Sequence, residues 1–245
     1  MNSSNWNRRS ELIVALDFEN LKPALEFVGT AGDSVTWYKV GSQLFCSAGP
    51  AAVAELKARG KKVFLDLKFH DIPNTVAGAV VEAVRMGADM VNVHASGGRE
   101  MMKAAVKSAS DNAKLGARPL VIAVTVLTSM DEPVLTEVLN RKDSYPPATH
   151  VPHLAKLAKD SGMDGVVASA HEIELIRNVC GNDFVLVIPG IRPADTSTDD
   201  QKRIMTPAEA VRKGANFLVV GRPVLKAKNP AEAALAIRAE MEKAV

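Results

Sequence analysis

The chain has 245 residues, of which 47% are hydrophobic and 24% charged, and its 30 Lys and Arg against 28 Asp and Glu give a net charge of +2. This size suits one large α/β domain or two smaller ones, whereas the near-neutral charge and 4% aromatic content disfavour nucleic-acid binding. The first ten residues are polar, and no apolar run approaches the roughly 20 residues of a membrane span. The two cysteines lie far apart in the sequence and are expected to be reduced core thiols. These features predict a cytoplasmic protein with no membrane segment.

From Glu11 onward, short β-branched runs alternate with segments of helical period, which is typical of βα units in a parallel sheet. Strands are predicted at Leu12–Asp17, Thr36–Gly41, Lys62–Lys68, Met90–Ala95, Leu120–Leu127, Gly165–Ser169, Phe184–Pro189 and Phe217–Gly221. The clearest helical segments are Pro50–Arg59, Val76–Met86, Glu100–Ser110, Leu154–Ser161, Glu172–Val179, Pro207–Lys213 and Ala231–Lys243.

Eight strands with helices between them predict a single-domain (β/α)8 TIM barrel over residues 11–245, preceded by a polar N-terminal arm at residues 1–10. A doubly wound open sheet is the alternative. It is disfavoured because no Gly-x-Gly-x-x-Gly turn follows the first strand.

In a barrel of this kind, catalytic residues lie where the strands end. The predicted strand ends are polar here, with Asp17, Lys39, Asp66, Lys68, His94, Thr128, Arg192 and Arg222. Charges at the ends of buried strands need partners or a ligand, so these positions are candidate site residues.

The stretch from Asp66 to Thr75 contains two of these charges, Asp66 and Lys68, and a third at Asp71. Asp66 and Lys68, two apart on a strand, point to the same side, and Asp71 follows three residues later. Pro73 is expected to end the strand pairing, with Asn74 capping the next helix. A solvated salt-bridge cluster is the alternative, but the preceding run Val63–Leu65 predicts a buried strand.

Lys39, Asp66, Lys68 and Asp71 together suggest proton transfer at carbon or a decarboxylation. A carboxylate beside a substrate anion repels it until the anion leaves as a neutral molecule, and a neighbouring lysine then supplies a proton. Metal binding is disfavoured because interleaved ammonium groups compete with a cation. His150 and His153 lie in a predicted Pro-rich loop without a third ligand.

The ends of the seventh and eighth predicted strands favour a phosphate site. Gly190 and Arg192 follow one, and Gly221 and Arg222 follow the other, at the position where barrels commonly bind phosphate. The alternative is that the glycines only turn the chain and the arginines are surface charges. The segment Ala194–Lys202 is rich in Asp, Ser and Thr, and is predicted to be a lid that brings Gln201 to the phosphate.

The stretch DLKFHDIPNT at residues 66–75 resembles the active-site signature of the orotidine 5'-phosphate decarboxylase family, in particular its bacterial group. The resemblance extends over the chain, through ALD at 15–17, KVG at 39–41, VNVHASGG at 91–98, VTVLTSM at 124–130, PGIRP at 189–193 and GRP at 221–223. It implies conversion of orotidine 5'-phosphate to UMP and carbon dioxide, the last step of UMP biosynthesis, without cofactor or metal.

The resemblance also implies a role for each matching residue. Lys68 would donate a proton to C6 of the pyrimidine and Asp66 would lie beside the departing carboxylate, while Asp17 and Lys39 would hold the ribose. Asp71, Ile72 and Thr75 would cross into the site of a neighbouring subunit, which implies a homodimer. The remaining contacts would be Thr128 or Ser129 at the pyrimidine, with Thr128 preferred, and a phosphate clamp of Arg192, Gln201, Gly221 and Arg222.

Two other functions remain open from the sequence. A magnesium-dependent sugar-phosphate decarboxylase or aldolase on the same barrel also carries a D-x-K-x-x-D pattern, and a chelator would inactivate it. A barrel that only binds nucleotide would bind UMP and leave orotidine 5'-phosphate unchanged.

Overall fold

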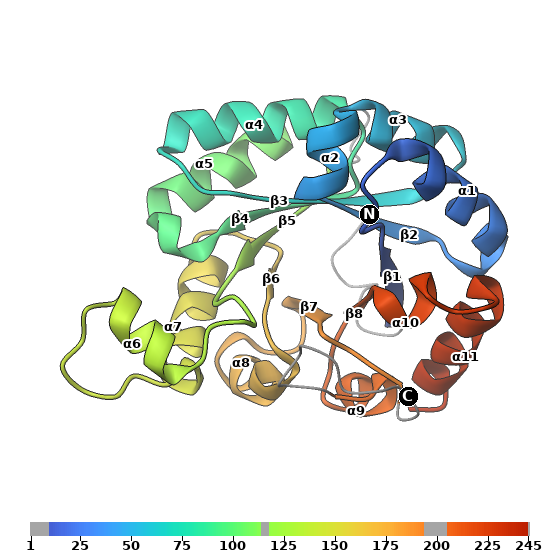
Figure 1. Cartoon of the computed structure of the whole chain (residues 1–245). Helices are drawn as coiled ribbons and strands as arrows, with labels where there is room; N and C mark the ends of the chain where they lie inside the picture. Colours follow the sequence, from blue (N-terminus) through green and yellow to red (C-terminus); the bar gives the residue numbers. More distant parts are fainter. Residues whose placement is uncertain (1–9, 114–117, 194–204, 245) are drawn as a thin grey trace.

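The computed structural model describes residues 10–113, 118–193 and 205–244. In these ranges eight parallel strands form a closed barrel in chain order, with β8 pairing back onto β1, and helices surround the ring of strands (Figure 1). This confirms the predicted TIM barrel. The strands are β1 (Glu11–Ala15), β2 (Trp37–Gly41), β3 (Lys62–Phe69), β4 (Met90–His94), β5 (Leu120–Val124), β6 (Gly165–Val167), β7 (Val185–Pro189) and β8 (Phe217–Val220).

The described helices include every one predicted and several more. They are α1 (Leu21–Ala31), α2 (Ser42–Ala48), α3 (Ala51–Ala58), α4 (Pro73–Arg85), α5 (Gly98–Asp111), α6 (Glu132–Val138), α7 (Pro147–Asp160), α8 (Ile173–Cys180), α9 (Pro207–Arg212), α10 (Arg222–Leu225) and α11 (Pro230–Glu242). Short 3₁₀ turns lie at Gly32–Ser34, Ala95–Gly97 and Ala170–Glu172. No helix in the described ranges is long and apolar enough to cross a membrane.

The prediction of a Pro-rich loop around His150 and His153 was wrong, because both residues lie in α7. Pro147 occupies the first turn, where a missing N–H costs nothing. Pro152 lies inside the helix and costs about 3 kcal/mol there. Burial of Val151, Leu154 and three neighbouring apolar residues on one face of α7 offsets this cost.

The core has two parts, one on each side of the sheet. The larger lies between the strands and the surrounding helices. The smaller, here called the interior plug, fills the barrel and consists of Ile13, Ala15, Trp37, Phe64, Met90, Ile122, Val185, Val187, Phe217 and Val219. Trp37 and Phe217 meet edge to face with ring centroids 5.2 Å apart. The plug closes the barrel from below, so a ligand can enter only from the mouth, where the strands end.

Three similar clamps stabilise the lower rim, where the strands begin. The residue before β4, β6 or β8 (Asp89, Asp164 or Asn216) accepts the N–H of a residue in the preceding strand, at 2.8 Å in each case. A cation from the chain that precedes the first strand of the pair completes each clamp: Lys57, Arg118 or Arg177. Each clamp therefore joins two strands and the segment that leads into the first of them.

Replacing Asp164 by alanine is expected to lower the free energy of unfolding by about 2–3 kcal/mol. The change removes two Arg118 hydrogen bonds of 2.6 Å and leaves the N–H of Val121 without its 2.8 Å acceptor. Urea unfolding followed by circular dichroism measures the loss. Asp111→Ala, which removes an exposed pair with Lys107 on α5, is the control and should change stability little; an equal effect of both variants would contradict the clamp.

Candidate active site

The polar side chains at the mouth continue the inward-facing rows of the interior plug. On a strand, residues two apart point to the same side. Lys39, Asp66 and Asn92 therefore follow Trp37, Phe64 and Met90, which belong to the plug. The charged groups therefore lie directly above the apolar plug, at the mouth of the barrel.

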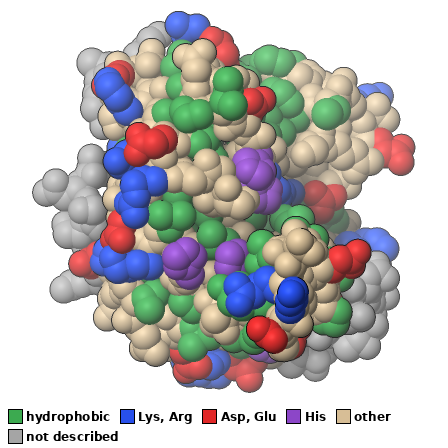
Figure 2. All heavy atoms as spheres, turned by 90° about the vertical axis from the view of Figure 1, so that its left-hand side faces the viewer, with side chains coloured by type: hydrophobic (Ala, Val, Ile, Leu, Met, Phe, Trp, Pro, Cys, Tyr) green, Lys and Arg blue, Asp and Glu red, His purple; other side chains and the backbone are tan. Residues whose placement is uncertain are grey.

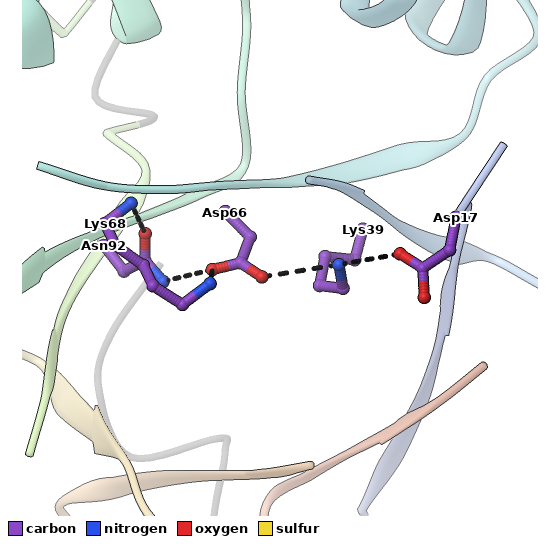
Figure 3. Close-up of polar contacts among 5 residues, drawn as sticks. All are labelled: Asp17, Lys39, Asp66, Lys68 and Asn92. Atoms are coloured by element: carbon purple, nitrogen blue, oxygen red, sulfur yellow. Dashed lines mark hydrogen bonds and ion pairs between the residues drawn. The ribbon is translucent and has the colours of Figure 1, made fainter. Parts of the chain in front are cut away.

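Four of the predicted residues form a chain of alternating charge across β1, β2 and β3 (Figure 3). Lys39 Nζ lies 3.3 Å from Asp17 Oδ1 and 3.4 Å from Asp66 Oδ2. Lys68 Nζ donates to the other oxygen of Asp66, at 2.7 Å. Asp66 is the best buried of them, with 11% of its side chain exposed, whereas 37% of Lys68 remains accessible. The structure thus brings together Lys39, Asp66 and Lys68, as predicted, but the second aspartate of the cluster is Asp17 and not Asp71.

Two glycines leave the space that this chain of charges occupies. A Cβ atom at Gly41 would lie 2.9 Å from Lys39 Nζ, and one at Gly221 would lie 3.4 Å from Asp17 Oδ2. A side chain at position 41 would therefore displace the ammonium group that connects the two aspartates.

The environment of Asp66 keeps its carboxylate ionised. Burial alone would raise its pKa, but the charges of Lys39 and Lys68, with hydrogen bonds from Lys68 and Asn92, outweigh burial and lower the pKa below its usual value. Because folding lowers the pKa of Asp66, the ionised carboxylate stabilises the folded protein. This contribution is complete above the ordinary pKa of aspartate and is lost only as the pH falls through the lowered pKa of the folded state. At neutral pH, Asp66 is therefore negative.

Strand β3 bulges where it carries these charges. Leu65 pairs with Val91 and Phe69 pairs with Val93, so the three residues 66–68 of β3 stand opposite one residue of β4, Asn92. Lys68 has φ +52°, in the left-handed region that residues other than glycine rarely adopt. Bulges of this kind re-aim side chains next to active sites, and this one directs Lys68 back to Asp66.

The sequence interpretation gave no role to Asn92, which is fully buried between these groups. Its Nδ2 donates to Asp66 Oδ1 at 2.7 Å, and its Oδ1 accepts the N–H of Lys68 at 2.8 Å (Figure 3). A signal was present: Asn92 is the one polar residue in the run Met90–Val93, and it shares the inward parity of Met90.

A cavity of about 170 Å³ opens beside Lys39, Asp66 and Lys68. Its apolar walls come from β3, β5, β6, β7 and β8 and from the segment after β5: Phe64, Val124, Val126, Leu127, Val167, Ala168, Pro189 and Val219. Thr128 also lines it, whereas Ser129 is not among its lining residues in the described part of the chain. Aliphatic walls with a few polar groups at one end suit a flat heterocycle.

The predicted phosphate residues follow two adjacent strands. β7 and β8 pair in parallel with Pro189 opposite Val219, so the chains that continue to Arg192 and Arg222 leave the same end of the sheet. Arg192 is buried, and Arg222 begins α10, a one-turn helix directly after β8. Gly190 has φ +78°, a turn that a side chain would strain. Gln201 and the whole of the predicted lid at Ala194–Lys202 lie outside the described residues.

Asp71, Ile72 and Thr75 are all exposed. The Asp71 carboxylate accepts the N–H of Ile72 at 2.6 Å, and no ion pair joins it to Lys68 within the described ranges. Ile72 is 67% exposed, an unusual state for a large aliphatic side chain. The predicted cap was wrong: α4 begins at Pro73 with Ile72 as the N-cap residue, so Asn74 lies in the first turn.

The remaining histidines and cysteines contribute no further cluster. His70 and His94 pack with ring centroids 5.2 Å apart; burial, followed by the charges of His70 and Lys68, lowers the pKa of His94. The described ranges contain no group of three His, Cys, Asp or Glu side chains that could hold a metal. The expectation of two core thiols holds for Cys180 but was wrong for Cys46, which is exposed on α2.

Comparison with known proteins places the chain in a family. The model of a family described as "Orotidine 5'-phosphate decarboxylase / HUMPS family" matches residues 10–237. The chain belongs to this family. Orotidine 5'-phosphate decarboxylase of Geotalea daltonii is 51% identical over 233 residues, covering 95% of this chain and 96% of the relative, and that of Geotalea uraniireducens is 51% identical over 229 residues, covering 94% of each.

A solved structure shows the same fold at high similarity. The crystal structure of orotidine 5'-phosphate decarboxylase from Lactobacillus acidophilus superposes with a TM-score of 0.85 at 38% identity, covering 95% of this chain and 99% of that chain. Family membership confirms the resemblance drawn from the signature at residues 66–75, and the matched span covers all eight strands of the barrel.

Proposed function

We propose that this chain converts orotidine 5'-phosphate to UMP and carbon dioxide, the last step of UMP biosynthesis, with Lys68 as the proton donor. The observation that carries the proposal is the Lys39–Asp66–Lys68 arrangement at one end of an apolar cavity. In a protein about 50% identical to orotidine 5'-phosphate decarboxylases over nearly its whole length, this arrangement supplies a fixed negative charge and a proton at one place.

The substrate is held at several points. The pyrimidine occupies the apolar cavity next to Thr128, and its carboxylate points to Asp66. Asp17 and Lys39, which form an ion pair beside the cavity, bind the ribose hydroxyls. Arg192, Gln201, Gly221 and Arg222 clamp the 5'-phosphate, where guanidinium groups can each bind two oxygens.

The chemical step uses the repulsion between two anions. The ionised Asp66 lies beside the substrate carboxylate, and the repulsion disappears when the bond from C6 to the carboxylate breaks and carbon dioxide leaves neutral. The bonding electrons remain on C6 as a carbanion, which the ammonium of Lys68 stabilises and protonates. Solvent then restores the proton of Lys68. This sequence needs no metal or cofactor, because the charges that a cation would supply come from the two lysines.

The complete site is proposed to contain residues from two subunits of a homodimer. Asp71, Ile72 and Thr75 reach out of their own subunit after β3, and the exposed Ile72 offers an apolar contact. Further exposed aliphatic side chains, Leu127, Val134, Val138 and Leu139, lie on or next to α6. Figure 2 shows the face of the molecule on which α6 and α7 protrude, with hydrophobic and histidine side chains among the charged ones. In this proposal Asp71 serves the active site of the neighbouring subunit. The enzyme is proposed to be cytoplasmic.

The test is an absorbance assay of orotidine 5'-phosphate with purified protein in excess chelator. We expect rapid conversion to UMP at an unchanged rate after chelation. Activity that requires added magnesium would instead favour a sugar-phosphate reaction on the same barrel, and binding of UMP without conversion would favour a nucleotide-binding protein.

A further inference from the structure

Asn92 lies where strand pairing is interrupted. On β4 it is flanked by Val91 and Val93, which pair normally with β3, while the bulge of β3 removes the regular backbone partner opposite Asn92. On the other side Asn92 pairs with Ile122 of β5. The side-chain amide of Asn92 makes two hydrogen bonds to the bulged segment, one to the backbone N–H of Lys68 and one to the carboxylate of Asp66.

These two bonds act on different parts of the site. Nδ2 donates to the same Asp66 oxygen that receives Lys68 Nζ, so this oxygen accepts two bonds of 2.7 Å and the carboxylate cannot rotate freely. Oδ1 accepts the backbone N–H of Lys68, whose left-handed φ of +52° persists only if its surroundings fix it. Both contacts lie inside the protein, where an unpaired polar group is costly.

We propose that Asn92 is a positioning residue that fixes both the carboxylate of Asp66 and the backbone of Lys68, and thereby sets the rate of the chemical step. The inference rests on the proposed function and adds a residue to it. Asn92 acts through its neighbours and orients the charge and the proton donor before substrate arrives. Its amide suits both tasks because it presents one donor and one acceptor side by side.

Two substitutions separate positioning from packing. Asn92→Leu keeps similar volume and removes both hydrogen bonds; kcat is expected to fall about 10- to 100-fold. The KM for orotidine 5'-phosphate should stay within about threefold, since the phosphate and ribose contacts remain. Asn92→Asp keeps the acceptor for Lys68 and replaces the donor by an oxygen that faces Asp66.

The Asn92→Asp variant has a pH signature that a packing defect lacks. Charged groups near position 92 are Asp66 and Lys68 on β3, Lys39 beyond Asp66 on β2, and His94 on β4. Two carboxylates in contact raise the pKa of one of them. Protonated, the new side chain donates to Asp66 as the amide did; ionised, it repels Asp66. The ratio of variant to wild-type kcat should therefore rise as the pH is lowered from about 8.5 to about 5.5.

Asn216→Asp is the matched control. Asn216 accepts a strand N–H at the same 2.8 Å, but at the lower rim and from Leu186. The Asn216→Asp carboxylate keeps the acceptor and faces Arg177, as Asp89 and Asp164 face their cations. The variant is expected to leave kcat unchanged at every pH. Wild-type enzyme that fails to convert orotidine 5'-phosphate would overturn the proposed function itself. With active wild type, an Asn92→Leu variant that keeps its kcat within threefold, or an Asn92→Asp ratio that is flat with pH, would overturn the role of Asn92.

Discussion

Lys68→Ala is expected to abolish decarboxylation, with kcat reduced by about 10⁴-fold or more. Lys68 is bonded to Asp66 at 2.7 Å and is still partly accessible from the cavity, so it can pass its proton to a bound ligand. Without it, the carbanion at C6 loses both its stabilising charge and its proton donor, and Lys39 is the one remaining ion-pair partner of Asp66 among the described residues.

The absorbance assay gives the rate for Lys68→Ala, and calorimetric titration with UMP shows whether the site remains formed. UMP affinity should change far less than kcat, because the variant leaves the proposed phosphate clamp untouched. Lys57→Ala is the matched control: Lys57 pairs with Asp89 at 2.6 Å at the lower rim, so its loss should reduce stability and spare turnover. Near-normal turnover of folded Lys68→Ala would disprove the proton-donor assignment.

Asp71→Ala is expected to be nearly inactive alone and to regain activity when mixed with inactive Lys68→Ala. If each site combines Lys68 of one subunit with Asp71 of the other, a mixed dimer contains one intact site. Random exchange of equal amounts makes about half of the dimers mixed, so about a quarter of all sites should be active.

The geometry of the single chain provides the control for this mixing experiment. Asp66 and Lys68 contact each other within one chain, so mixing Asp66→Ala with Lys68→Ala should restore nothing. Two different affinity tags on the parent variants would establish that mixed dimers formed. If mixed dimers of Asp71→Ala and Lys68→Ala form and stay inactive, Asp71 does not serve the neighbouring site.

The fold could be predicted because βα alternation is a local pattern. Strand parity also predicted that Asp66 and Lys68 point to the same side, although some strands were expected to extend further than they do: β5 ends at Val124 instead of Leu127. The bulge opposite Asn92 could not be predicted, because it depends on the register between β3 and β4, which neither strand encodes alone.

Other features escaped the sequence interpretation because burial decides them. Helix α7 forms despite Pro152, since its apolar face packs inside the protein. Cys46 and Cys180 have similar local sequence signals, yet only Cys180 is on the inner face of its helix. Asp71 belongs to the signature at residues 66–75 but is exposed and forms no ion pair with Lys68 in the described ranges, a difference that adjacency in the sequence does not reveal.

The three clamps of the lower rim divide six of the eight strands into pairs. Each joins an odd-numbered strand to the even-numbered strand that follows it: β3 to β4, β5 to β6 and β7 to β8. No clamp connects β4 to β5 or β6 to β7. New chain ends introduced by circular permutation after an even-numbered strand and before the next cation (Lys57, Arg118 or Arg177) would leave every clamp in one continuous segment. A break inside a pair would separate an anchor from its cation.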